Sequence, residues 1–169
     1  MFIKRILALL IVLVAGYGIA NAQGGRPPVA GTWEVVKIET RLFSQEDNQL
    51  LEKKTLTKAE EFKNLTGFVP MKISVEGENC MITNASGFTE TGKYKIEEKG
   101  VLLYQKALPP MPQNVMPGIP SPEAPYLPYR YKVQSGGTLL LELPGASFMD
   151  TARSVPVVLE CTCYYKKKQ

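Results

Sequence analysis

The spacing of apolar residues near the C-terminus is the feature that most limits how this chain can fold. Apolar side chains occupy alternate positions there: Val155, Val157, Leu159, Cys161, Cys163 and Tyr165. From residue 160 to residue 166 the positions between them are polar. Successive side chains of a strand point to opposite faces, whereas a helix repeats every three to four residues. The spacing therefore predicts a strand that buries one face.

The same period of two recurs in shorter segments, at residues 71–76, 92–97, 129–134 and 138–143. Turn residues such as Gly77-Glu78-Asn79 and Ser135-Gly136-Gly137 separate neighbouring segments, and tight turns of this kind join antiparallel strands. Seven or eight strands in one meander predict an all-β fold. We expect an antiparallel up-and-down β-barrel, because closure leaves no exposed edge, and a sandwich is the alternative.

The first strand candidate, residues 31–40, does not keep a single apolar face. Trp33 and Val35 share one face, while Val36 and Ile38 share the other. A β-bulge, which inserts one residue and reverses the alternation, would explain this pattern, and so would burial of both faces.

One short helix is predicted at residues 57–65. Thr57 and Glu60 have the spacing of a capping box, and Gly67 follows as a C-terminal stop. The rest of the chain favours strands, so helix is a minor part of the fold.

The first 22 residues are typical of a cleavable secretory signal peptide. Lys4 and Arg5 precede an apolar run at residues 6–15 that is too short to span a bilayer comfortably, and Ala20-Asn21-Ala22 offers small residues to a signal peptidase. We expect a periplasmic, cell-surface or secreted protein in which residues 23–169 form one domain without a membrane segment; an uncleaved anchor is the alternative. Cleavage lowers the formal charge of +4 by two, and no basic stripe suggests nucleic acid as a partner.

The three cysteines, Cys80, Cys161 and Cys163, form an odd set in a compartment that oxidises thiols. Cys161 and Cys163 lie two apart on one strand face, with about 6.5 to 7 Å between their Cα atoms, at the limit for a disulfide. A bridge from Cys80 to one of them and three reduced, buried thiols are therefore the alternatives. No metal site is expected, because no fourth ligand accompanies the thiols.

Residues 108–128 form a proline-rich loop, which we expect to be neither a helix nor a central strand. Apolar residues such as Met111, Val115 and Ile119 alternate with the prolines. The loop would either cover an open end of the barrel or, as a binding element, gate a ligand or dock a protein partner.

Gly31-Thr32-Trp33 opens the first strand and resembles the Gly-x-Trp signature of the lipocalins. Residues 92–97, the hairpin of residues 131–141 and the closing residues 164–167 are similar to the short lipocalin-like domains of exported bacterial proteins. The resemblance implies an eight-stranded barrel, with Trp33 as a structural residue at the closed end and a pocket for an apolar or amphipathic molecule at the other. The arginine that lies across the tryptophan in this family has no clear counterpart among residues 166–168, and Arg153 is the candidate for it.

The chain contains no histidine, which removes the usual catalytic triads, histidine zinc sites and the common general base near neutral pH. We therefore expect no enzyme and no cofactor. The first hypothesis is a binding module for a small apolar ligand, and its candidate residues are aromatic or lie in the proline-rich loop: Tyr94, Tyr104, Met116, Tyr126, Tyr129 and Tyr131. The alternative is an envelope or secreted interaction domain with a filled barrel, which binds a protein partner through the proline-rich loop.

Overall fold

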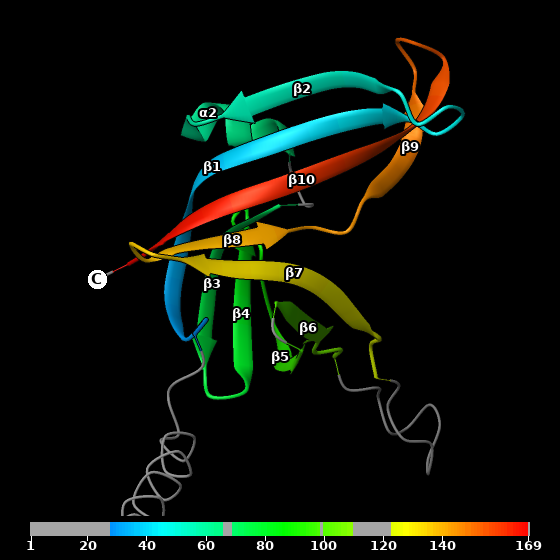
Figure 1. The fold of residues 1–169 in the computed structure, drawn as a ribbon. Coiled ribbons are helices and arrows are strands. Elements are labelled where there is room, and N and C mark those ends of the chain that lie inside the picture. The colour runs from blue at the N-terminus through cyan, green and yellow to red at the C-terminus, as the bar shows by residue number, and fades with distance from the viewer. Residues whose placement is uncertain (1–27, 66–68, 99, 110–122, 169) are drawn as a thin grey trace, which may run out of the picture.

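Ten antiparallel strands form one continuous sheet in the computed structural model, which describes residues 28–65, 69–98, 100–109 and 123–168 (Figure 1). They are β1 (Gly31–Ser44), β2 (Leu50–Leu56), β3 (Pro70–Glu76), β4 (Asn79–Asn84), β5 (Thr89–Glu98), β6 (Val101–Lys106), β7 (Tyr126–Gln134), β8 (Thr138–Glu142), β9 (Ala146–Asp150) and β10 (Val155–Lys167). Eight of them close into a barrel in the order β1-β3-β4-β5-β6-β7-β8-β10, because β10 also pairs with β1. From β3 to β8 each strand pairs with the next one along the chain, so the predicted up-and-down barrel is confirmed.

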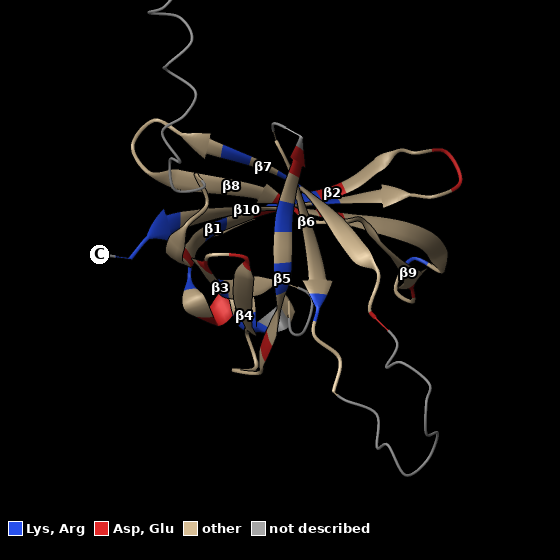
Figure 2. Cartoon of the chain, turned by 90° about the horizontal axis from the view of Figure 1, so that it is seen from below, with Lys and Arg blue, Asp and Glu red and all other residues tan. Residues whose placement is uncertain are grey.

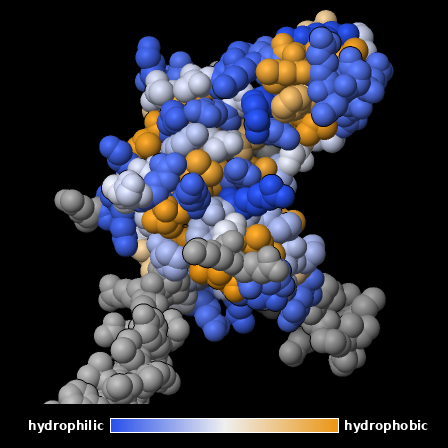
Figure 3. Space-filling model, in the orientation of Figure 1, coloured by the Kyte–Doolittle hydropathy of each residue, from blue (hydrophilic) through white to orange (hydrophobic). Residues whose placement is uncertain are grey.

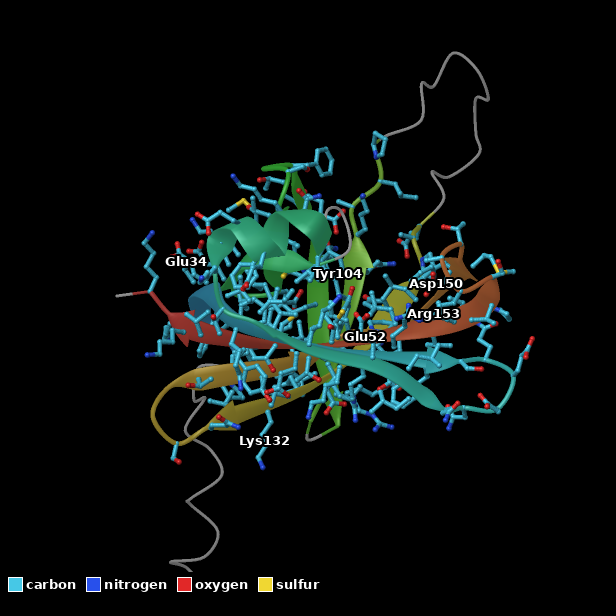
Figure 4. The ribbon with its side chains drawn as sticks, turned by 90° about the horizontal axis from the view of Figure 1, so that it is seen from above. Glu34, Glu52, Tyr104, Lys132, Asp150 and Arg153 are labelled. Atoms are coloured by element: carbon cyan, nitrogen blue, oxygen red, sulfur yellow. The ribbon has the colours of Figure 1, made fainter. Side chains whose placement is uncertain are left out.

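The two longest strands, β1 and β10, continue beyond the barrel and remain paired with each other. β2 pairs with the outer half of β1, and β9 pairs with the outer half of β10, which makes a four-stranded extension in the order β2-β1-β10-β9 (Figure 1). We call this extension the projecting sheet. Arg153, in the turn before β10, bonds Asp150 and also Glu52 of β2, at 3.3 Å, so one side chain connects the two outer strands (Figure 4).

The projecting sheet buries only part of its apolar surface. Val157 and Leu42 are buried on its inner face. Leu50, Phe148 and Met149 are exposed near its end, where hydrophobic atoms reach the surface (Figure 3). This part of the fold therefore presents apolar side chains to solvent.

A β-bulge at Val36 explains the mixed pattern of the first strand. The register of β1 against β10 shifts between Val35 and Lys37, so that Trp33 and Ile38 both pack into the core. Trp33 is 2% exposed and Ile38 is fully buried, whereas Val36 is 40% exposed. The bulge interpretation is confirmed.

The alternating faces predicted for the later strands also form the core. β8 contributes two leucines and the residue after it a third, β10 contributes two cysteines and a tyrosine, and β3 contributes two aliphatic residues: Leu139, Leu141, Leu143, Cys161, Cys163, Tyr165, Ile73 and Val75. Tyr165 crosses the interior, and its hydroxyl donates a buried hydrogen bond of 2.8 Å to the carbonyl oxygen of Pro70. This bond connects β10 to the start of β3.

The helix is shorter than predicted, and its cap lies one residue later. α2 (Ala59–Phe62) and the 3₁₀ turn η1 (Lys63–Leu65) lie between β2 and β3. Glu61, rather than Glu60, accepts hydrogen bonds from the backbone N–H groups of Thr57 and Lys58, at 2.9 and 3.0 Å. Gly67 lies outside the described residues. Within the described ranges, no helix has the length and apolar character needed to cross a membrane.

The proline-rich loop ends earlier than the predicted residue 128. β7 begins at Tyr126, so Pro128 belongs to a strand of the barrel and lies opposite Leu103 of β6. On its other side β8 has already ended, because Glu142, the last residue of β8, pairs with Arg130. Proline is tolerated there because β7 has a neighbouring strand on one side only.

Candidate functional site

The tyrosines predicted to bind a ligand are divided between the interior and one end of the barrel. At this end β4 and β6 finish and β5 and β7 begin, and we call it the open end. Tyr94 and Tyr104 are buried. On β7, Tyr129 and Tyr131 are half-buried, and Tyr126, at the start of the strand, is exposed. Met116 lies outside the described residues.

The barrel interior is packed. Its apolar side chains, among them Ile73, Leu102 and Leu141, leave a cavity of only about 30 Å³. Pockets for small molecules usually measure about 300 to 1,000 Å³. Tyr94 and Tyr104 therefore serve to pack the interior, and a ligand of ordinary size needs another space.

A cleft of about 480 Å³ lies in the side of the barrel between β7 and β10. β8 stops at Glu142, whereas β7, which runs antiparallel to it, extends beyond that point to its own first residue, Tyr126. The cleft forms beside this unmatched part of β7, and the segment Leu143-Pro144-Gly145 that follows β8 forms one of its walls. The volume is within the range of small-molecule pockets. The short β8 thus opens a surface site of ligand size beside a closed interior.

The lining of the cleft is both charged and apolar. Arg41 and Glu160 form an ion pair of 3.0 Å on its β1–β10 side, and each side chain is about half exposed. Arg130 and Glu142, which are opposite each other in the β7–β8 register, supply a second pair of opposite charges. Apolar wall is provided by Val101, Leu143 and Cys161. The cleft can accept a molecule with an apolar body and polar groups.

A smaller pocket of about 120 Å³ lies at the open end, and we call it the mouth pocket. Its lining includes Asn84, Phe88 and Glu90. Glu90 faces the barrel interior because it pairs with the inward residue Ile82, and Gly92 pairs with Cys80 in the same way. Glu90 accepts a hydrogen bond of 3.4 Å from the hydroxyl of Tyr104. It also forms an ion pair of 2.6 Å with Nζ of Lys106.

Tyr129 is the residue that the three spaces share. It lines the interior cavity, the cleft and the mouth pocket. Burial and, after it, the charge of Glu90 raise the pKa of Tyr129 and of Tyr104 above their ordinary values. Burial, with Glu90 second, raises the pKa of Cys80 to about 12. These groups are therefore neutral at pH 7, and Glu90 is the charge that acts on them.

Trp33 is buried near the start of β1. Its Nε1 donates a buried hydrogen bond of 2.8 Å to the carbonyl oxygen of Val29, and Nζ of Lys167 lies 5.6 Å from the centre of its ring. Gly31, with φ of +116°, lies against the Lys167 side chain. The cation beside the tryptophan is thus a lysine, and the expectation for Arg153 is corrected, because Arg153 lies on the projecting sheet.

All three cysteines are free and buried in the structure. Cys80 lies on β4, and the other two lie on the inner face of β10. Burial raises the pKa of Cys161 to about 11 and that of Cys163 to about 12, so these thiols are protonated at neutral pH. The bridge from Cys80 stays a prediction, and a thiol count under denaturing conditions tests it.

Of the residues that line the cleft and the mouth pocket, the sequence predicts Tyr129 as a ligand-binding residue and does not single out the charged ones. Glu90 could have been found, because it has the same parity as Tyr94 and Ile96 and the strand begins three residues earlier than the predicted segment 92–97. Arg41, Glu160 and Thr162 could not, because they occupy the outward face of their strands and come together only where β8 ends.

Comparison of the chain with protein-family models, curated proteins and solved structures finds no match.

Proposed function

We propose that this chain is an exported, non-enzymatic binding module of lipocalin-like type, which takes a small amphipathic ligand in the side cleft rather than inside the barrel. The observation that carries the proposal is the contrast in volume between the interior cavity, about 30 Å³, and the cleft, about 480 Å³. Export is supported by the N-terminal signal pattern. The lipocalin-like type is supported by Gly31-Thr32-Trp33 and by the up-and-down barrel.

The chemistry of the cleft favours an amphipathic ligand over a purely apolar one. Leu143 and Cys161 offer apolar contact, while the Arg41–Glu160 pair at the rim offers charged hydrogen-bond donors and acceptors. A second hollow of about 440 Å³ lies over Met81 and Thr91 on the outer face of β4 and β5. The described residues of its lining include one glutamate and one lysine, whereas the cleft carries two glutamates and two arginines.

Native mass spectrometry of the protein purified from its own host tests the proposal. Thr162 lines the cleft from the outward face of β10, so Thr162→Phe should fill the cleft without entering the core. The matched control is Thr55→Phe on the exposed face of β2. We expect a bound mass on the wild-type protein and the control that is lost from Thr162→Phe. A bound mass retained by Thr162→Phe would place the ligand elsewhere.

A protein-interaction domain is the second candidate, because apolar side chains are exposed where the proline-rich loop leaves and rejoins the barrel. Phe88 is 59% exposed, and Leu108, Tyr126 and Leu127 are each 40–43% exposed. Replacement of residues 110–122 by a glycine–serine linker of equal length leaves β6 and β7 complete. Loss of a co-purifying protein with an unchanged fold would favour this candidate, and an unchanged set of partners would count against it.

A further inference from the structure

The mouth pocket differs from the cleft in its charge. Glu90 is the one acidic or basic residue among the described residues that line it, whereas the cleft carries two arginines and two glutamates. The carboxylate points toward the barrel interior, and its side chain is only 26% exposed. The acidic start of β5 and the basic end of β6 lie at the same end of the barrel (Figure 2).

The chain itself shows how this pocket treats a cation. Nζ of Lys106 lies 2.6 Å from Oε2 of Glu90 and 5.7 Å from the centre of the Phe88 ring. A carboxylate and an aromatic face each stabilise an ammonium ion in proteins. Lys106 does not line the pocket and is 44% exposed, so it holds Glu90 from the rim and can move into solvent.

The remaining lining also suits a cation with an apolar tail. Tyr129 presents a second aromatic ring, and Ile82 and Val69 form apolar wall toward the interior. The hydroxyl of Tyr104 donates a hydrogen bond of 3.4 Å to Oε1 of Glu90, on the interior side of the carboxylate. The raised pKa values of Tyr104, Tyr129 and Cys80 have Glu90 as a shared cause after burial, which indicates negative potential around the pocket.

We propose that the mouth pocket binds an alkylammonium group, and that Lys106 is a built-in competitor that an incoming amine displaces from Glu90. This site is separate from the proposed ligand site in the cleft, with which it shares only Tyr129. The amine is either a free molecule or the side chain of a lysine on a partner peptide. Both sources present the same head group, and the experiment includes both.

Calorimetric titration of the full chain with n-butylammonium, and with N-acetyl-lysine methylamide as the peptide-borne amine, tests the proposal. n-Butanol is the neutral control ligand. Glu90→Gln keeps the shape of the side chain and should weaken amine binding about tenfold, because it removes a charge-assisted hydrogen bond. Phe88→Leu should weaken it about threefold.

Lys106→Met gives the result that separates competition from simple charge. We expect tighter amine binding by about threefold to tenfold, because the internal ammonium no longer occupies Glu90. Lys132→Met, on the exposed face of β7, makes the same change in net charge at a distance and should leave affinity unchanged (Figure 4). Emission of Trp33 checks that each variant is folded.

Three outcomes would overturn the proposal: equal binding of butanol and butylammonium, unchanged affinity in Glu90→Gln, or equal gains in Lys106→Met and Lys132→Met. Thr162→Phe should leave amine binding intact. Loss of amine binding in this variant would be a fourth such outcome, because it would place the amine in the cleft. An empty cleft in native mass spectrometry would reject the proposed function and leave this titration informative.

Discussion

Gly92 determines how Tyr104 packs inside the barrel. A Cβ atom at this position would lie 2.5 Å from the Tyr104 ring and would also overlap the carbonyl oxygen of Gln105. Glycine is usually unfavourable within a strand. It is needed at this position because it leaves space for the Tyr104 ring. The same ring carries the hydroxyl that donates a hydrogen bond to Glu90, so this glycine also affects the mouth pocket.

Gly92→Ala is therefore expected to lower the free energy of unfolding by about 1–3 kcal/mol, the usual cost of overpacking. Urea unfolding followed by the fluorescence of the single tryptophan measures it. Gly145→Ala is the control, because its Cβ would meet only the Val158 side chain, at 3.0 Å, and the carbonyl oxygen of Leu159, at 4.0 Å. Equal stability of Gly92→Ala and wild type would contradict the packing described.

The buried thiols predict a loss of stability at alkaline pH. Burial raises the pKa of Cys80 and Cys163 from 9.0 to about 12, and that of Cys161 to about 11. Above pH 9 a thiol ionises in the unfolded chain but stays protonated in the folded one, so unfolding releases a proton and the free energy of unfolding falls as pH rises.

Each thiol should contribute a fall of about 1.4 kcal/mol per pH unit between its two pKa values, and its contribution is constant below pH 9. Urea unfolding between pH 8 and pH 11 measures the slope. Cys163→Ala should be less stable at every pH and should show a shallower slope by one thiol. A slope that the substitution does not change would mean that this thiol is not buried as described.

At the scale of single elements, the bulge in β1 allows one strand to serve two parts of the fold. Before Val36 the strand lies between β3 and β10, and after it the strand lies between β2 and β10. The extra residue keeps Trp33 and Ile38 in the same core although their positions differ by an odd number. The change of apolar face in the sequence left a bulge and burial of both faces as alternatives, and the register shift identifies the bulge.

Deletion of Val36 should turn either Trp33 or Ile38 away from the core and prevent native folding, because a shift of one residue exchanges the faces of a strand. Val36→Ala should be tolerated, since the side chain is 40% exposed. Circular dichroism and Trp33 emission distinguish the two variants. A deletion variant with wild-type emission and stability would show that the bulge is dispensable.

The two strands that the sequence did not reveal are β2 and β9. β2 carries Glu52, Lys53 and Lys54 in succession, which hides any alternation, and β9 is only five residues long. Both exist because β1 and β10 are long enough to offer unpaired edges beyond the barrel. Strand length and distant pairing, rather than local pattern, determine such elements.

At the scale of the whole molecule, the barrel could be predicted and the cleft in its side could not. Alternation and tight turns specify neighbours in a meander, so the order from β3 to β8 follows from the sequence. The cleft follows from unequal strand lengths, since β8 ends at Glu142 and leaves the part of β7 near its first residue, Tyr126, without a neighbour on that side. The volume of the interior depends on how large side chains such as Tyr104 and Tyr165 pack against one another, and a pattern of apolar positions carries no such information.

The central claim is that the barrel is packed and that ligands bind at the cleft in its side. Nitrogen-15 NMR of the full chain, titrated with a set of uncharged and amphipathic small molecules, tests this most directly. The account predicts that the amide shifts which change with added ligand cluster at Leu143, Gly145 and Thr162, around the cleft. Changes centred instead on Ile73, Tyr94 and Leu102, in the interior, would contradict it.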